Sequence, residues 1–494
     1  MTTSKQEREL LAKIPTGLLI GGDFRDASTG ARFDVIDPAT GDVLATVADA
    51  SPQDGQAALA AAAAAQESWA KTPARARGEI LRKAFELVTA RVDDFALAMT
   101  LEMGKPLAES RGEVAYGAEF LRWFSEEAVR IAGRYSVAPD GVNRLLVTRR
   151  PVGPCLFITP WNFPLAMATR KIAPAIAAGC TMVLKPAELT PLTALLLGRV
   201  LAEAGLPAGV LNIIPTTAPG PVTAPLLADS RLRKLSFTGS TATGQRLLAA
   251  SADQVLRVSM ELGGNAPFLV FEDADLDAAV EGAIVAKLRN GGEACVAANR
   301  FLVHESVADE FGRRLAQRMA SFRVGRGTEP NTLLGPMINA AAIVKISRLV
   351  DEAIADGAKL ATGGCAVDRP GYFFEPTVLT DVPVTSAIVR EEIFGPVATV
   401  VGFATEDEAV AIANDTPFGL VAFAFTRDLN RALRMAERLD SGMIGINAGV
   451  VSNPAAPFGG VKQSGLGREG GPEGIDEYLE TVYVAIADPF SGSR

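Results

Sequence analysis

Val152-Gly-Pro-Cys-Leu-Phe-Ile158, followed by the apolar segment 164–178, decides the fold class of this chain. The first stretch has the length of a buried strand, and the second has the length and composition of a helix. The alternation continues through strands at 181–184, 210–214 and 233–238, with a helix at 191–204. Strands that alternate with helices predict an α/β fold built on a parallel sheet.

A second series of the same kind follows residue 261. Its expected strands are 268–271, 300–303, 394–403 and 443–446, with helices between them. Upstream, short strands are expected within 18–50, and helices over 57–70, 77–103 and 109–132. These patterns predict two α/β domains, and no internal repeat of 20 to 50 residues stands out.

Composition limits the class of protein. A chain of 494 residues is too long for one ordinary domain. The formal net charge of −9 argues against a nucleic-acid surface, and no apolar run reaches the ~18 residues of a membrane span. The start of the chain is polar and carries both charge signs, unlike a secretory signal. We therefore expect a cytoplasmic protein that binds neither nucleic acid nor a membrane.

Cysteine and histidine usage limits the chemistry. The four cysteines, at 155, 180, 295 and 365, form no CxxC pair, which fits a reducing compartment. The only histidine, His304, falls at the end of an expected strand, where a structural role is the simpler interpretation. A histidine-rich zinc site is excluded, and we expect no metal. Any catalytic base is then expected to be a carboxylate or a lysine.

Two glycine-rich segments carry reactive side chains. Glu261-Leu-Gly-Gly-Asn265 offers a carboxylate, and Asn290-Gly-Gly-Glu-Ala-Cys295 offers a thiol. A thiolate is a strong nucleophile, and a nearby glutamate can serve as base for it or for a water molecule. The pair suits an enzyme that forms a thioester and then hydrolyses it.

Both segments resemble the signature motifs of the aldehyde dehydrogenase superfamily, and further matches follow over most of the chain: 159–164, 184–188, 237–244, 391–396 and 457–469. The resemblance implies that Cys295 attacks the aldehyde and that Glu261 activates the hydrolytic water. It also implies that Asn162 and the Cys295 N–H stabilise the oxyanion. By the same match, Lys171 and Glu469 carry protons between the site and bulk water.

The turn Phe237-Thr-Gly-Ser-Thr-Ala-Thr-Gly244 lacks GxGxxG spacing, so the ordinary dinucleotide fingerprint is absent. It resembles the family's variant turn, in which a helix N-terminus faces a pyrophosphate. Glu188 would repel a ribose 2′-phosphate, which favours NAD over NADP, although NADP stays possible. The resemblance assigns these cofactor residues: Thr159, Pro160, Trp161, Asn162, Lys185, Pro186, Ala187, Glu188, Gly239, Ser240, Leu262, Glu392 and Phe394.

Within the superfamily, the substrate loops look most like those of succinate-semialdehyde dehydrogenases. Those enzymes hold a distal carboxylate with two arginines and a serine, which match Arg170, Arg289 and Ser452. The arginines could instead form surface salt bridges. Other acidic aldehydes also stay open: glutarate semialdehyde, 2-oxoglutarate semialdehyde and sulfolactaldehyde. So does a catalytically silent NAD-binding structural protein, which would need none of the reactive residues.

Two positions depart from the family pattern. Glu293 stands where glutamine is commoner and adds a negative charge near the nucleophile. Ala297 replaces a second cysteine of some relatives, so a loop disulfide is not expected.

The resemblance implies a Rossmann-like NAD(P)-binding domain, a second α/β catalytic domain and a small set of oligomerisation strands. We assign the first domain to residues 1–130 and 151–261, and the second to 262–450. The oligomerisation elements are assigned to 131–150 and 470–494, with strands at 144–149 and 478–486. A long exposed strand edge is best covered by another copy of the chain, so a homodimer or homotetramer is expected.

Overall fold

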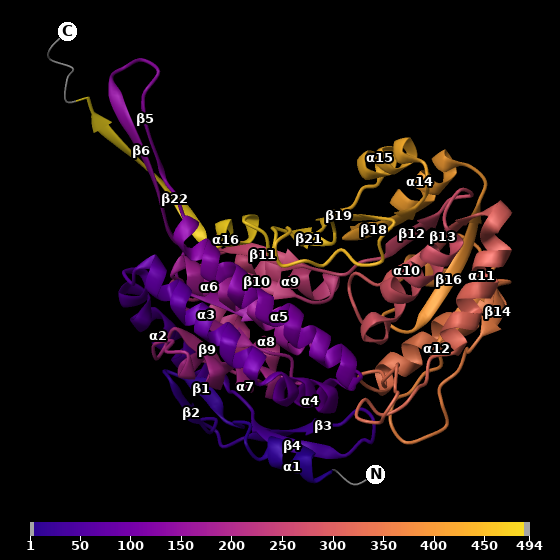
Figure 1. Cartoon of the computed structure of the whole chain (residues 1–494). Helices are drawn as coiled ribbons and strands as arrows, with labels where there is room; N and C mark the ends of the chain where they lie inside the picture. The colour runs from indigo at the N-terminus through magenta and orange to yellow at the C-terminus, as the bar shows by residue number, and fades with distance from the viewer. Residues whose placement is uncertain (1–3, 489–494) are drawn as a thin grey trace.

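The computed structural model describes residues 4–488 of the chain. Figure 1 shows two α/β bodies side by side, each built on its own sheet, and a narrow strand arm that projects from the first body. The predicted α/β fold is confirmed.

The first sheet has eight strands in the order β2-β1-β9-β8-β7-β10-β11-β21. Its five central strands run parallel in the order β9, β8, β7, β10 and β11. The strand bounds are β1 Leu18–Ile20, β2 Asp23–Arg25, β7 Cys155–Ile158, β8 Met182–Lys185, β9 Leu211–Ile213, β10 Lys234–Thr238, β11 Arg257–Glu261 and β21 Gly465–Leu466. β21 joins the sheet beside β11 from more than 200 residues away, which the sequence pattern did not predict.

Helices surround this sheet. Their bounds are α1 Lys5–Leu11, α2 Pro52–Ala70, α3 Ala74–Ala90, α4 Val92–Met103, α5 Leu107–Glu127, α6 Pro164–Ala178, α7 Pro191–Glu203, α8 Pro219–Leu227 and α9 Thr241–Ser251. A short 3-10 turn, η1 Ala128–Arg130, follows α5, and a hairpin of β3 Arg32–Ile36 and β4 Val43–Ala48 lies near the N-terminus. The apolar faces of α3 to α7 share one core with β7 and β8.

The second sheet has seven strands in the order β14-β15-β16-β13-β12-β18-β19. Its strands are β12 Ala266–Val270, β13 Ala298–His304, β14 Lys359–Thr362, β15 Thr377–Thr380, β16 Val397–Phe403, β18 Val421–Phe425 and β19 Met443–Ile446. Its helices are α10 Leu276–Leu288, α11 Glu305–Ala320, α12 Ala340–Ala355, α13 Ala387–Arg390, α14 Glu406–Asn414 and α15 Leu429–Arg438. All strand pairs except β14 with β15 are parallel.

The projecting arm is a three-stranded antiparallel sheet in the order β22-β6-β5. It contains β5 Arg134–Val137, β6 Asn143–Pro151 and β22 Leu479–Ala487, and the short helix α16 Glu473–Asp476 precedes β22. A separate antiparallel pair joins β17 Phe418–Gly419, which lies between α14 and β18 in sequence, to β20 Val461–Lys462, which follows β19. The proposed domain boundaries stay a prediction, and residues 1–3 and 489–494 lie outside the described part.

Several predicted elements differ in their bounds, among them the helices expected at 57–70 and 109–132, and three of the differences have a clear local cause. The expected helix 77–103 is two helices, because Arg91 leaves the helical conformation (φ −112°, ψ 29°). The strand expected from Val152 begins at Cys155, after Gly153 at φ 120° and Pro154. The strand expected from Phe394 begins at Val397, because Phe394 has φ 58° and Pro396 lacks an N–H for the sheet. Within residues 4–488, no helix is both long and apolar enough to cross a bilayer.

Candidate active site

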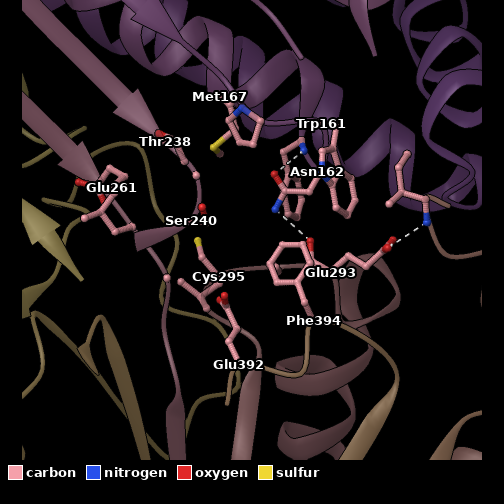
Figure 2. A pocket seen from close by; sticks show the side chains of 18 of the residues that line it. Trp161, Asn162, Met167, Thr238, Ser240, Glu261, Glu293, Cys295, Glu392 and Phe394 are labelled. Atoms are coloured by element: carbon pink, nitrogen blue, oxygen red, sulfur yellow. Dashed lines mark hydrogen bonds between the residues drawn. The ribbon is translucent and has the colours of Figure 1, made fainter. Parts of the chain in front are cut away.

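A cavity of about 390 Å³ lies at the carboxyl ends of β10 and β11, where open α/β sheets usually bind ligands. Thirteen of the residues singled out in the sequence line it: Pro160, Trp161, Asn162, Arg170, Gly239, Ser240, Glu261, Leu262, Arg289, Cys295, Glu392, Phe394 and Ser452. The others do not line it: Thr159, Lys171, Lys185, Pro186, Ala187, Glu188 and Glu469. Figure 2 shows Cys295 between Glu261 on one side and Asn162 on the other.

Cys295 follows a tight turn at the end of α10. Asn290, Gly291 and Gly292 all have positive φ, and a Cβ on Gly292 would lie 2.2 Å from the Gly395 carbonyl oxygen. This close approach explains the glycine at 292 and fixes the loop against the opposite wall. Burial raises the pKa of the half-buried Cys295 thiol to about 12, although Arg170 opposes the shift. The resting side chain at neutral pH is therefore the thiol.

Asn162 is held by four hydrogen bonds, one of which is donated by Asn290 Nδ2 to the Asn162 carbonyl oxygen at 3.0 Å. Asn162 Nδ2 donates to the Glu293 carbonyl oxygen at 3.0 Å, and its Oδ1 accepts from the Phe163 N–H at 3.1 Å. Its own carbonyl oxygen accepts from Lys105 Nζ at 2.7 Å. These contacts fix the amide group and leave the second N–H of Nδ2 for another acceptor, as an oxyanion-hole donor requires.

Glu261 ends β11 and is 2% exposed. Neither of its carboxylate oxygens has a hydrogen-bond partner within residues 4–488. Burial, aided by the charge of Glu469, raises the pKa of this carboxyl well above its ordinary value. A carboxylate with a raised pKa binds a proton more strongly than an ordinary glutamate, which suits a base that takes a proton from water.

Glu469 lies between two cations behind the cavity. Its carboxylate oxygens lie 2.5 Å from Arg170 Nε and 2.5 Å from Lys171 Nζ, and all three side chains are buried. Burial opposes ionisation of Glu469, but Lys171 and Arg170 outweigh it and lower its pKa. Burial likewise opposes the charge on Arg170, but Glu469 raises the pKa of the guanidinium. Arg170 also lies 4.0 Å over the Phe458 ring, so its charge is already satisfied by the protein.

Arg289 is in a different situation. Its guanidinium lies 5.2 Å from the Phe163 ring centroid and 5.5 Å from that of Tyr116. Within residues 4–488 it forms no salt bridge with a carboxylate. Arg289 and Ser452 also line a small side pocket next to Cys295, so the two side chains lie near each other at one end of the cavity.

Glu293 is buried in the cavity wall (Figure 2). Its Oε1 accepts from the Ile338 N–H at 3.0 Å, and its Oε2 has no partner within the described chain. Burial raises the pKa of this carboxyl well above its usual range. Burial therefore works against the extra negative charge expected near the nucleophile, because it favours the neutral form of this carboxyl.

Eight of the thirteen residues assigned to the cofactor line the cavity, and the assignment stays a prediction. Gly239 and Ser240 place the N-terminus of α9 at the cavity, and Trp161 packs edge-on against Phe394 with 5.5 Å between ring centroids. Glu392 accepts from the Gly264 N–H at 3.1 Å, and burial raises the pKa of its carboxyl to about 7. Lys185 and Glu188 form an ion pair of 3.2 Å at the end of β8, away from the cavity lining.

Several lining residues were not assigned a role from the sequence. Phe163 and Phe458 lie within matched motifs, whereas Tyr116 on α5 and the residues at the start of α12 do not: Ile338, Asn339, Ala341, Ala342 and Lys345. Helical periodicity predicts only that α5 and α12 are packed helices, so it could not identify Tyr116 or the α12 residues as cavity residues. Among residues 4–488, no cluster of three or more His, Cys, Asp or Glu side chains is arranged to hold a metal ion.

Comparison with known proteins agrees with this geometry. The model of the aldehyde dehydrogenase family matches residues 24–484. The succinate-semialdehyde dehydrogenase of Paenarthrobacter nicotinovorans is 64% identical over 91% of this chain and 100% of its own length. The glutarate-semialdehyde dehydrogenase of Pseudomonas putida is 48% identical over 95% of this chain and 97% of its own.

The same family appears among solved structures. The structure titled as an Escherichia coli NADP-dependent enzyme superposes with a TM-score of 0.95 at 47% identity and covers 96% of this chain and 98% of its own. The family matches span nearly the whole chain, and the reactive thiol, carboxylate and amide lie in one cavity. The chain therefore belongs to the aldehyde dehydrogenase family and is an NAD(P)-dependent oxidoreductase.

Proposed function

We propose that this enzyme oxidises succinate semialdehyde to succinate. The observation that carries the substrate class is Arg289, a cation at the cavity that stacks on two aromatic rings and forms no salt bridge within residues 4–488. The buried carboxyl of Glu109 interacts with its charge but does not form an ion pair with it. A substrate with a distal carboxylate would supply the ion-pair partner in a charge-assisted bond. Ser452 adds a hydroxyl donor beside it, and Arg170 adds positive potential from the cavity wall.

In the proposed reaction, the S–H bond of Cys295 breaks and its proton passes to water. Sγ then forms a bond to the aldehyde carbon, and the carbonyl oxygen takes the negative charge. The free N–H of Asn162 Nδ2 and the Cys295 N–H stabilise the oxyanion. A nicotinamide dinucleotide held in the cavity would supply the hydride acceptor, and loss of the hydride from the substrate carbon would leave a thioester on Cys295. Glu261 then takes a proton from water as its oxygen attacks the thioester carbon, and the Cys295 thiolate departs. The thiol, the water and the carboxylic acid product each lose one proton, and the departing thiolate takes one back. Each turnover therefore releases two protons.

The substrate proposal is tested with Arg289→Met, a substitution of similar length without charge. We expect kcat/KM for succinate semialdehyde to fall by about one to two decades, because a hydrogen bond to a charged group is worth ~1.5–3 kcal/mol. Butanal, which has no distal anion, should lose little. Arg318→Met is the matched control, since Arg318 also stacks on an aromatic ring, at 5.3 Å from Phe322, but is absent from the cavity lining.

Equal losses for the two aldehydes would mean that Arg289 is structural. A panel that includes glutarate semialdehyde and sulfolactaldehyde then tests the alternatives, since a kcat/KM higher for either than for succinate semialdehyde would overturn the substrate assignment. Arg170→Met is expected to slow both aldehydes, because it also removes half of the charge that neutralises Glu469.

We further propose that Glu188 sets a preference for NAD. Its side chain is 42% exposed beside the buried Lys185, so it is free to accept a bond from a ribose 2′-hydroxyl and to repel a 2′-phosphate. In Glu188→Ser, the ratio of kcat/KM for NAD over that for NADP should fall by about tenfold. Glu391→Ser, at an exposed glutamate, should leave the ratio unchanged. A wild-type enzyme that already prefers NADP would contradict this assignment.

A further inference from the structure

The two proposed oxyanion-hole donors lie on separate loops. The Asn162 amide belongs to the loop between β7 and α6, and the Cys295 N–H follows the turn at the end of α10. An oxyanion hole works only when both donors lie about 2.7–3.1 Å from the same oxygen atom. The site therefore depends on contacts that fix one loop against the other.

Asn290 joins the two loops through its side chain. Its Nδ2 donates to the Asn162 carbonyl oxygen at 3.0 Å and to the Glu293 carbonyl oxygen at 2.9 Å. The Glu293 carbonyl oxygen also accepts from Asn162 Nδ2 at 3.0 Å, so the three residues form a closed set of hydrogen bonds. Both N–H groups of the Asn290 amide are used in this set, and Asn290 does not line the cavity. Its side chain therefore connects the loops and is not part of the substrate site.

The backbone of Asn290 is held as well. Asn290 is buried and has φ 56° and ψ 36°, a left-handed conformation that asparagine adopts more readily than most residues other than glycine. Such a conformation persists where surrounding contacts enforce it. The Asn290 N–H donates to Oε2 of Glu109, in the first turn of α5, at 2.7 Å. Glu109 therefore supplies this contact from outside the loop that carries Cys295.

A second charged contact from the same region holds the Asn162 loop. Lys105 Nζ donates to the Asn162 carbonyl oxygen at 2.7 Å and to Glu113 Oε2 at 2.5 Å. Glu113 Oε1 accepts from two N–H groups in the first turn of α6, at 2.9 Å and 3.1 Å. Lys105, Glu109 and Glu113 thus hold both loops against the start of α5, and Asn290 adds a direct bond between the loops.

We propose that Asn290, held by Glu109, is a positioning residue that keeps the Asn162 amide and the Cys295 N–H directed at one oxyanion. The proposal rests on the proposed attack of Cys295 on a carbonyl carbon and extends it to two residues that do not line the cavity. Asn162 keeps one N–H on the Glu293 carbonyl oxygen and directs the other at the oxyanion. Without the Asn290 side chain, that single bond would join the loops among these residues, and the two donors could shift relative to each other.

Asn290→Gly tests the side chain alone, because glycine adopts a positive φ without strain and removes both donated bonds. Asn331→Gly is the matched control, since Asn331 also has a positive φ (63°), is exposed and does not line the cavity. Glu109→Gln and Glu109→Met form a second pair. Glutamine keeps an oxygen acceptor for the Asn290 N–H, whereas methionine has a similar length and no oxygen.

Three reactions of Cys295 in the full-length enzyme separate oxyanion stabilisation from the reactivity of the thiol. Succinate semialdehyde with NAD gives a burst of NADH, and p-nitrophenyl acetate gives a burst of nitrophenolate, both measured by stopped flow. In both, Sγ attacks a carbonyl carbon and an oxyanion forms; with the ester, the C–O bond then breaks and nitrophenolate leaves. Iodoacetamide differs, because Sγ displaces iodide at a saturated carbon and no oxyanion forms. In all three reactions the thiol proton passes to solvent.

We expect Asn290→Gly and Glu109→Met to slow both bursts by about ten- to a hundredfold, since loss of a whole oxyanion donor costs ~10²–10³. Alkylation by iodoacetamide and the Kd for NAD should stay within about threefold of wild type, because neither depends on transition-state contacts to an oxyanion. Glu109→Gln should restore both bursts to within about threefold, since the accepted hydrogen bond is kept. Asn331→Gly should match wild type in every measurement.

A double variant shows whether Asn290 acts through Asn162. Asn162→Ala removes the side-chain donor itself, so adding Asn290→Gly to it should slow the bursts by less than about threefold more. Residues that act independently would instead give the product of the two single effects.

The full product of the two losses in the double variant would overturn the proposal. So would an equal decrease in alkylation and both bursts, which would indicate a role in the fold or in the thiol itself. If Asn290→Gly does not fold, the Glu109 pair decides, and equal bursts in its two variants would overturn the proposal. Failure of the proposed function is distinguishable, because the ester and iodoacetamide require neither aldehyde nor NAD. A wild-type enzyme that gives a nitrophenolate burst but no NADH burst would lose the substrate assignment and leave this test intact.

Discussion

At the scale of single residues, Glu293 has a carboxyl whose protonated form is favoured by burial in the fold. Its raised pKa means that the folded state favours the protonated form, whereas the unfolded chain ionises near pH 4.3. The contribution of this proton to the free energy of unfolding is fully present below that pH. It decreases as the pH rises toward the folded-state pKa, by up to ~1.4 kcal/mol per pH unit.

Glu293→Gln keeps the shape and the contact to Ile338 but cannot ionise. The Tm of the variant minus that of wild type should therefore increase between pH 5 and pH 8, by about 2 °C or more. Turnover should stay within about threefold of wild type. Glu119→Gln, at a half-exposed glutamate, is the control, and an unchanged Tm difference across this range would show that Glu293 is ionised in the fold.

Glu261 offers a second test at this scale. Glu261→Gln removes the proposed base but not the nucleophile, so acylation should proceed while hydrolysis slows by about 10²-fold or more. The acyl-enzyme should then accumulate on Cys295 and be visible by intact-protein mass spectrometry. In wild type, hydrolysis should rise with pH as the raised carboxyl deprotonates, and this rise should vanish in the variant. Loss of the burst instead would assign Glu261 to activation of the thiol.

At the scale of elements, the loop after β11 and the loop that carries Cys295 touch through Gly264. A Cβ at this position would lie 2.5 Å from the Cys295 carbonyl oxygen, a backbone atom that cannot move aside. Gly264→Ala should displace the nucleophile and lower kcat/KM by about tenfold or more, because a misplacement of ~1 Å can cost 10²-fold. Gly112→Ala, whose Cβ meets nothing within 4 Å, should keep full activity. Normal turnover in Gly264→Ala would mean that the loop contact is dispensable.

Elements also show where sequence patterns succeed and fail. α6 was predicted at its observed bounds, because Pro164 and Gly179 mark its start and end. The break between α3 and α4 was missed, because both helices bury apolar residues in one core and the spacing continues through Arg91. Asp93 and Asp94, acidic residues in the first turn of α4, were the available signal.

The residues of the candidate site also divide into those that the sequence could identify and those that it could not. Cys295, Glu261 and Asn162 could be found because each lies in a glycine- or proline-rich loop with a recognisable pattern. Tyr116 and Phe458 could not, because an aromatic residue in a helix or loop gives the same pattern whether it faces a core or a cavity. The pairing of Arg170 with Glu469 depends on a contact between residues 299 positions apart, which no local pattern contains.

At the scale of the whole molecule, the arm places two strand edges and several apolar side chains in solvent (Figure 1). β22 exposes Tyr483, Val484 and Ile486 at 57%, 41% and 42%, and β5 exposes Tyr135 and Val137 at 63% and 49%. A monomer with such an arm would be prone to aggregate, since open edges template pairing with other strands. We therefore propose that another copy of the chain covers the arm in a homodimer or homotetramer.

The oligomer is tested by light scattering coupled to size-exclusion chromatography. Wild type should show a multiple of the 51.7 kDa chain mass. Val484→Lys combined with Ile486→Lys places charge on the β22 edge, the device by which natural proteins block strand pairing, and should shift the mass toward 51.7 kDa. Leu433→Lys is the matched control, because Leu433 is an equally exposed apolar residue, at 59%, on α15 and far from the arm in sequence. A wild-type mass of one chain, or the same decrease in Leu433→Lys, would rule out the arm as the surface that joins the copies.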